Sequence, residues 1–424
     1  MCSASAMAQV AAKFDKAAIL KKIERSNNDI ADPKKNVKGA TWMQRGDIFY
    51  EAAAAPTKGL YGTMDVATLT LMFGQPASTE TKVINGVAYD VLSYANFDVY
   101  VANNAVVFWT SKVQVIDNPL AEAYSAYAKA AELDKKQESK AGSGITSVAN
   151  LYKEKASNLY SLNEHTAAAA DFKAAYEIQT VPFVNKIDTI SLFYAGLLYT
   201  IGGDFENAAP LLEKAKEYGH LDEGNTYYYL GFSKTHLGEY DDAKTVLFEG
   251  LKQYPENNNI VEGLIFLYER SGEEPADLVE IIKGSISEDP DNVRLWSGLG
   301  RIYDKLDDID GAIVAFNKAV ELAPQDFANN FNLGLYYLKN AEKIDLENGS
   351  IPFTNAAAVE AARERVLNEY RLSIPYLEKA HQINPTAYDP VNLLKNVTFR
   401  LRDDESMMKK YEQYNELLKQ FPQS

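Results

Sequence analysis

Apolar residues recur along most of the chain with the period of an α-helix, in pairs of short segments separated by polar turns. In one such pair, Trp296, Leu299 and Tyr303 lie at positions i, i+3 and i+7, so their side chains share one face of a helix. Phe316 lies in the matching second segment, and Pro324 follows it, where it prevents the helix from continuing. The spacing predicts two helices joined by a short turn.

The same pattern returns along the chain with a period of about 34 residues. A glycine holds the same register in four copies, where a residue without a side chain lets two helices cross closely: Gly196, Gly231, Gly300 and Gly334. Together with less regular copies, this pattern predicts helix pairs over residues 152–175, 192–215, 227–255, 255–290, 293–324, 333–385 and 389–422.

An eighth pair is predicted at the start of the chain, with an insertion between its two helices. Trp42, Gly46 and Phe49 fill positions of the first helix, and Ala123, Tyr127 and Ala130 fill those of the second. The insertion, residues 57–117, changes to the alternating pattern of strands. We expect strands over Thr81–Ile84, Val87–Leu92, Phe97–Val101 and Ala105–Trp109.

Turn residues support a meander of these strands. Asn85-Gly86 is a strong signal for a two-residue hairpin, and Asn103-Asn104 tolerates the left-handed backbone that the last hairpin needs. A helix is expected before the strands, over Met64–Phe73, and Gly74 ends it.

The seventh helix pair is enlarged by a second insertion, which predicts a helical extension at about residues 340–370. The first helix is expected to continue through Lys343, a turn to lie around residues 348–352, and a long second helix to run from about Thr354 to His381. Such helices offer a docking arm, and the alternative is a lengthened loop without a partner.

From Val293 to Pro324 the chain fills every position of the pattern W-x2-L-G-x2-Y…A-x3-F…P. This segment resembles a tetratricopeptide repeat (TPR). The resemblance implies an all-α fold, a right-handed TPR-type solenoid of about eight helix-turn-helix repeats, with a small β-meander inserted in the first repeat. The insertion weakly resembles small envelope lipoproteins of the SmpA/OmlA type, and a plain β-hairpin embellishment is the alternative.

The TPR resemblance also implies a partner-binding groove, lined by fixed positions of the first helix of each repeat. Those positions hold Phe193, Leu197, Tyr228, Phe232, Phe266, Arg294, Arg301, Phe331 and Leu335. Aromatic and arginine side chains commonly anchor protein interfaces. We therefore expect a partner protein or peptide with an apolar face, and a carboxylate on it that Arg294 and Arg301 select. The alternative is that some of these residues pack as core.

Charge and hydropathy narrow the choice of partners. The 424 residues include 43 Lys and Arg against 59 Asp and Glu, which gives a net charge of −16. Binding nucleic acid requires clustered positive charge, so the composition argues against a nucleic-acid partner. No apolar stretch approaches the length of about 18 residues that a membrane-spanning helix needs.

The first residues predict export. Ala6 and Ala8, followed by Gln9, match the small-residue pattern at the end of a signal peptide, so residues 1–8 are expected to be the end of one and the protein to be periplasmic. Cys2, the only cysteine, could instead carry a lipid anchor at the periphery of the outer membrane. A cytoplasmic protein that starts at Met1 is a further alternative.

Motifs for chemistry are missing from the sequence. The four histidines fall in different repeats without metal-ligand spacing, and no nucleotide-binding or nucleophile motif occurs. We predict no catalytic, cofactor-binding or metal-binding residues, and hence a non-enzymatic scaffold. The alternative function is a lipid-anchored accessory factor in the assembly of an envelope complex, and an unrecognised hydrolase is a third. The predicted domains are the N-terminal helices, residues 9–56, the α/β insertion, 57–117, and the solenoid, 118–424.

Overall fold

The computed structural model describes residues 14–254, 257–273, 275–349, 351 and 354–421. Within them the chain divides into two compact units, one ending at His220 and the other starting at Leu221. The predicted signal-peptide end with Cys2, and the turn residues Pro255, Ser350, Pro352 and Pro422, lie outside the described residues.

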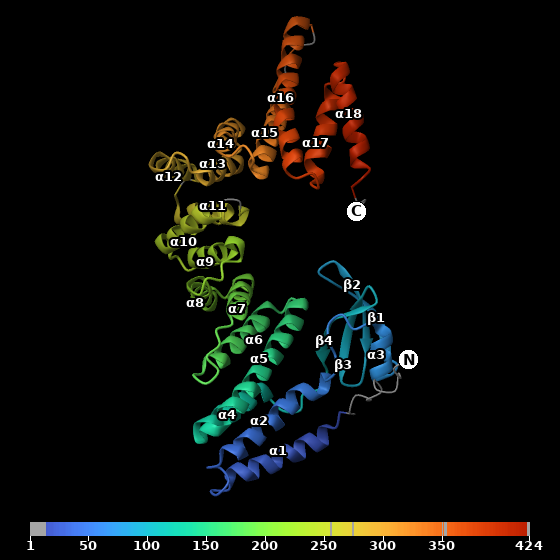
Figure 1. Cartoon of the computed structure of the whole chain (residues 1–424), viewed down its shortest axis with the longest axis vertical. Helices are drawn as coiled ribbons and strands as arrows, with labels where there is room; N and C mark the ends of the chain where they lie inside the picture. Colours follow the sequence, from blue (N-terminus) through green and yellow to red (C-terminus); the bar gives the residue numbers. More distant parts are fainter. Residues whose placement is uncertain (1–13, 255–256, 274, 350, 352–353, 422–424) are drawn as a thin grey trace. The chain divides into compact units, whose positions relative to one another are not determined.

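The first unit consists of helices and one sheet (Figure 1). Its helices are α1 (Lys16–Ala31), α2 (Gly39–Ala54), α3 (Val66–Phe73), α4 (Pro119–Leu133), α5 (Glu138–Ser161), α6 (His165–Glu177), α7 (Thr189–Ile201) and α8 (Phe205–Glu217). Its strands are β1 (Ser78–Ile84), β2 (Val87–Ser93), β3 (Phe97–Ala102) and β4 (Ala105–Ser111). Helix pairs α2/α4, α5/α6 and α7/α8 pack against one another in order.

The second unit is built from helices alone among its described residues. They are α9 (Asn225–His236), α10 (Tyr240–Gln253), α11 (Asn258–Ser271), α12 (Pro275–Glu288), α13 (Val293–Lys305), α14 (Ile309–Leu322), α15 (Phe327–Asn348), α16 (Ala356–Ile383), α17 (Tyr388–Arg400) and α18 (Glu405–Leu418). Consecutive helices form five pairs, so the predicted series of eight helix pairs is confirmed across the two units.

Glycine sets the close approach of the two helices in a pair. A Cβ atom on Gly231 would lie 2.4 Å from Cγ of Leu247, and one on Gly300 would lie 2.6 Å from the ring of Phe316. The equivalent glycines of other pairs meet a large side chain of the second helix in the same way: Gly46 meets Tyr127, Gly196 meets Leu212, and Gly334 meets Leu377. The shared register in the sequence therefore has one physical cause, a helix crossing that leaves no room for a side chain.

Acidic and amide side chains start many of the helices. Asp204 accepts a hydrogen bond from the backbone N–H of Asn207 at the start of α8, and Asp308 accepts one from Gly311 at the start of α14. Such caps satisfy backbone donors that the first turn of a helix leaves unpaired. The polar turns of the sequence thus define where the second helices begin.

The predicted meander is confirmed, with antiparallel strands in the order β1-β2-β3-β4. Asn85 and Gly86 form the first turn with φ values of 53° and 77°, and Asn103 and Asn104 form the last with 50° and 62°. Leu92, Val99 and Trp109 belong to a core that the sheet shares with α3. Val91, Tyr100 and Phe108 form a separate cluster, against which Leu162, at the end of α5, packs. A helix of the insertion therefore covers one face of the sheet, and the end of α5 packs against the other.

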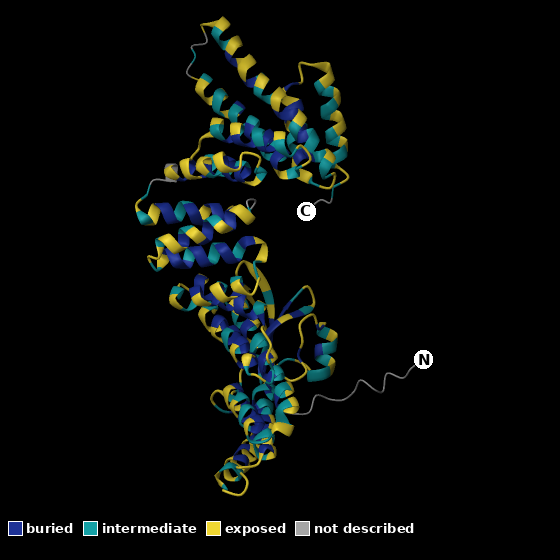
Figure 2. Ribbon diagram, turned by 60° about the vertical axis from the view of Figure 1, so that its left-hand side comes forward, coloured by how far each residue is buried: buried dark blue, intermediate teal, exposed yellow. Residues whose placement is uncertain are grey.

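The predicted enlargement of the seventh pair is also confirmed as helical. α15 and α16 pack along much of their length, and Asn348 donates a hydrogen bond to the carbonyl oxygen of Ala362. Figure 2 shows mainly exposed residues at the far end of this hairpin and buried ones near α17. The extension is thus two long helices rather than a lengthened loop.

Candidate partner-binding surface

Three of the predicted groove residues meet on neighbouring helices of the second unit. The ring of Phe232, on α9, stacks on Phe266, on α11, with centroids 4.9 Å apart and an interplanar angle of 27°. Tyr228 lies one turn before Phe232, and their rings are 5.7 Å apart. All three side chains are half-buried, so each ring has both a packing contact and an accessible part.

His236 completes this group. It is the last residue of α9 and is exposed, with its ring 4.6 Å from Phe232 and 5.1 Å from Phe266. Partial burial and then the positive charge of Arg270 lower the pKa of His236 from its usual value. We call Tyr228, Phe232, His236 and Phe266 the aromatic surface.

A signal for His236 was present in the sequence. Tyr228, Phe232 and His236 are spaced at i, i+4 and i+8, which places them along one face of a helix. Metal-ligand spacing, on which the prediction for the histidines rested, does not detect a stripe of this kind.

Charged side chains border the aromatic surface. The negative charge of Glu262 acts on Tyr228, whose pKa is raised mainly by burial and then by that charge. Glu262 also accepts a hydrogen bond of 2.7 Å from Lys305. A partner that covers the rings therefore meets both signs of charge at the edge.

Phe193 does not present its ring to solvent. It is 3% exposed and contacts Tyr194 and His220, with centroids 5.6 and 4.9 Å apart. Leu197, one turn later on α7, is half-buried. The ring of Phe193 thus packs in the core of the first unit rather than lining a groove.

The two arginines occupy different surroundings. Arg294 is exposed, and its Nη1 donates a 2.9 Å hydrogen bond to the carbonyl oxygen of Gln253, the last residue of α10. Arg301 is half-buried, and its charge opposes the rise in the pKa of Tyr336 that burial and Asp304 cause. Arg294 is therefore placed at the surface, whereas Arg301 acts within its own helix bundle.

Phe331 and Leu335 lie on α15, both half-buried. The ring of Phe331 stacks on Phe327 with centroids 6.0 Å apart, and Phe331 packs against the core around Leu377 and Leu394. Among the described residues, no ring contact joins Phe331 or Leu335 to the aromatic surface.

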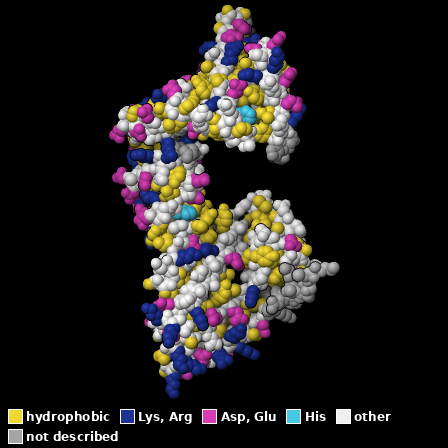
Figure 3. Space-filling model, viewed as in Figure 1, with side chains coloured by type: hydrophobic (Ala, Val, Ile, Leu, Met, Phe, Trp, Pro, Cys, Tyr) yellow, Lys and Arg dark blue, Asp and Glu magenta, His cyan; other side chains and the backbone are white. Residues whose placement is uncertain are grey.

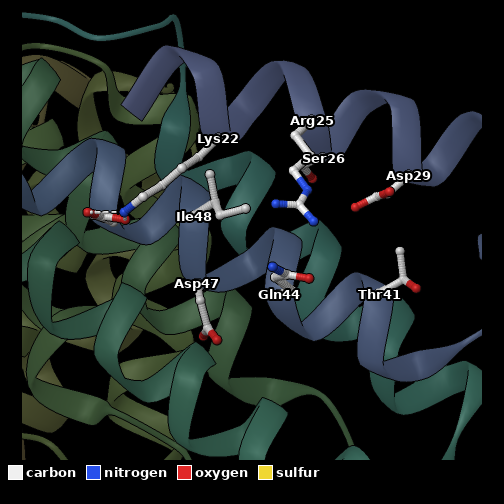
Figure 4. Close-up of a pocket in the computed structure, with 9 residues that line it drawn as sticks. Lys22, Arg25, Ser26, Asp29, Thr41, Gln44, Asp47 and Ile48 are labelled. Carbon is white, nitrogen blue, oxygen red and sulfur yellow. Dashed lines mark hydrogen bonds and ion pairs between the residues drawn. The ribbon is translucent and has the colours of Figure 1, made fainter. Parts of the chain in front are cut away.

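A hollow of about 350 Å³ lies between α1 and α2 (Figure 4). Its charged groups are largely paired with one another or with neighbours: Lys22 lies 2.7 Å from Glu51, Asp29 lies 2.5 Å from Lys35, and Asp47 accepts a 2.8 Å hydrogen bond from Tyr127. The Lys22–Glu51 ion pair joins α1 to α2, the first helix of the first repeat.

Two further properties concern the described residues as a whole. None of their His, Cys, Asp and Glu side chains form a group of three that could hold a metal ion. None of the helices formed by these residues combines the length and the apolar character needed to cross a membrane.

Figure 3 shows hydrophobic side chains reaching the surface of both units among mixed charges.

Comparisons with known proteins agree with the repeat pattern. Residues 293–326 match the family model described as tetratricopeptide repeat. These residues lie outside the insertion, so the match gives no support to its resemblance to SmpA/OmlA-type lipoproteins. No curated protein matches the chain.

Three solved structures illustrate the similar proteins. The human IFIT1 dimer with m7Gppp-AAAA is 15% identical, with 69% of this chain and 68% of that chain covered and a TM-score of 0.31. A TPR repeats protein from Bacteroides fragilis is 13% identical, with 59% and 98% covered and a TM-score of 0.28. MamA of MSR-1 is 16% identical, with 55% and 97% covered and a TM-score of 0.25.

Proposed function

We propose that this tetratricopeptide-repeat protein is a non-enzymatic scaffold that binds a partner protein or peptide on its aromatic surface. One observation carries the proposal: Phe232 and Phe266 stack on each other from adjacent repeats while both remain half-buried. Rings held in place by neighbours lose little conformational freedom when a partner covers them, which favours binding.

The proposed partner presents an apolar face, as an extended peptide or an amphipathic helix does. Arg294 is exposed and carries a positive charge, so a carboxylate of the partner is proposed to pair with it. Nucleic acid is the less suitable partner because the net charge of −16 repels phosphates.

We also propose that the scaffold acts in the bacterial periplasm. The support is the small-residue pattern at Ala6 and Ala8 in the sequence. The alternatives, a lipid-anchored protein at the outer membrane and a cytoplasmic one, lead to different partners in the experiment below.

The experiment is a crosslinked pull-down from native cells with quantitative mass spectrometry. We expect the double variant Phe232→Ala, Phe266→Ala to lose most of the crosslinked partner, roughly a tenfold decrease, because truncation of interface aromatics commonly costs 2 kcal/mol or more. Phe399→Ala is the matched control, since this ring on α17 is 43% exposed and lies outside the aromatic surface.

The outcomes separate the alternatives. Equal recovery with the double variant and the native chain, at an unchanged Tm, would show that the partner binds elsewhere. A large fall in Tm of the double variant would show that both rings serve stability. Recovery of cytoplasmic proteins alone would contradict a periplasmic location.

A further inference from the structure

A cleft of about 710 Å³ lies in the first unit, between the β insertion and the helices of the repeats. Residues 109–115, at the end of β4 and after it, form one side, and α5 contributes Tyr152, Glu154, Lys155 and Asn158. The insertion is fixed to α5 there, because the backbone N–H of Trp109 donates to Oδ1 of Asn158 at 3.4 Å. The volume lies in the range of small-ligand sites.

One carboxylate in the wall of the cleft is almost fully buried. Asp171, on α6, is only 8% exposed, and burial raises its pKa. Lys155 opposes this rise from 3.0 Å, but its own side chain is 58% exposed. Water therefore screens the charge of Lys155 more than that of Asp171. The ion pair offsets only part of the free-energy cost of burying the Asp171 carboxylate.

A second carboxylate lines the same cleft. Burial raises the pKa of Glu154, and a hydrogen bond with the Trp109 side chain opposes the rise. Among the ion pairs of the described residues, none includes Glu154. A buried carboxylate, Asp171, and a half-buried one, Glu154, thus share the cleft with one partly solvated lysine.

Lys112, the other cationic residue that lines the cleft, already has hydrogen-bond and ion-pair partners. The ammonium of Lys112 donates to Oγ of Ser93 and to the carbonyl oxygen of Tyr94 at 2.8 and 2.7 Å, and it lies 3.2 Å from Asp98. Aromatic and aliphatic side chains complete the lining, among them Trp109, Tyr152 and Leu151.

We propose that this cleft binds an ammonium or guanidinium group that is attached to an apolar or aromatic body. A cation beside Glu154 and Asp171 would make charge-assisted hydrogen bonds and offset the cost of their burial. Leu151 and Tyr152, both half-buried, would contact the apolar body, and aromatic rings also attract cations. The group can belong to a free amine or to a Lys or Arg side chain of another protein.

The first test compares two probes of nearly the same shape, benzamidine, which is a cation, and neutral benzamide. Binding to the full chain is measured by calorimetry at pH 8, well above the ordinary pKa of carboxyl groups. We expect benzamidine to bind at least tenfold more tightly than benzamide. Equal affinities, or binding of neither probe, would overturn the proposal.

Variants locate the binding and guard against misfolding. We expect Glu154→Gln to weaken benzamidine binding at least tenfold, with Glu132→Gln, a surface carboxylate on α4, as its control. Lys155→Gln removes the competing cation, so it should tighten binding, whereas Lys155→Arg should not. A gain in affinity of the Lys155→Gln variant cannot arise from unfolding. If Lys155→Gln shows no gain and Glu154→Gln binds benzamidine as tightly as the native chain, the probe binds elsewhere.

The two sources of the cation give different results. A capped Leu-Arg-Leu peptide that binds more tightly than benzamidine would identify a side chain of another protein. Benzamidine binding without peptide binding would identify a free amine. Because the cleft and the aromatic surface lie on different units, Phe232→Ala leaves this binding unchanged if the two proposals are independent.

Discussion

At the scale of single residues, glycines mark the positions where the two helices of a repeat cross closely. Gly231 and Gly284 are both inside helices, but their surroundings differ. A Cβ atom on Gly231 would lie 2.4 Å from Leu247, whereas nothing lies within 4 Å of one on Gly284. Comparing the two positions therefore distinguishes the steric requirement for glycine at a helix crossing from the ordinary free-energy cost of glycine inside a helix.

Replacing each glycine with alanine should have opposite effects. We expect Gly231→Ala to lower the free energy of unfolding by about 1–3 kcal/mol, because the added methyl group overpacks the helix crossing. Gly284→Ala should raise it by up to about 1 kcal/mol, since alanine favours the helix and meets no neighbour. Urea denaturation followed by circular dichroism measures both, and similar effects for the two variants would refute the role assigned to the crossing.

The residues of the candidate surface were less predictable than those of the crossings. The positions of Tyr228, Phe232 and Phe266 follow from the repeat register, but the burial of Phe193 depends on Tyr194 and His220, which pack around it. His236 shares a helix face with Phe232, and its place in the surface is set by its contacts with the two rings of Phe232 and Phe266. Register predicts which way a side chain points, and neighbouring residues decide how much of it remains exposed.

At the scale of elements, the sheet of the insertion meets the repeats along α5 and at its end. Leu162 packs against the cluster of Val91, Tyr100 and Phe108, and Asn85 donates a 2.8 Å hydrogen bond to Asn163. The sequence predicted the strands and turns from alternation and from Asn-Gly. It could not predict this docking, because the residues that meet are far apart in the chain, with 78 positions between Asn85 and Asn163.

Truncation of the docking leucine should loosen the sheet alone. We expect Leu162→Ala to cost about 1–2 kcal/mol, less than for a fully buried leucine, and to speed amide exchange in β2, β3 and β4. Leu20→Ala, at a position that is 40% exposed on α1, is the control. Faster exchange throughout the first unit would show instead that the sheet and the repeats unfold together.

At the scale of the whole molecule, the fold divides into units that tryptophan can report separately. Trp42 and Trp109 belong to the first unit and Trp296 to the second. In repeat proteins each repeat contacts its neighbours, so a local change in stability spreads through adjacent interfaces.

This division makes the effect of Gly231→Ala dependent on the reporter. In a Trp42→Phe, Trp109→Phe background, fluorescence follows Trp296, and we expect Gly231→Ala to lower the urea midpoint. In a Trp296→Phe background, fluorescence follows the first unit, and the shift should be smaller. Equal shifts in both backgrounds would mean that the two units unfold as one.

Both enlargements of this chain occur at the turn between the two helices of a pair, after α2 and after α15. The crossing of those helices persists in each case, with Gly46 against Tyr127 and Gly334 against Leu377. The turns at Gly203 and Gly238 hold the same place in other pairs. A reporter domain grafted at either turn would leave the crossings intact, which makes these turns the sites to choose for labelling the protein in living cells.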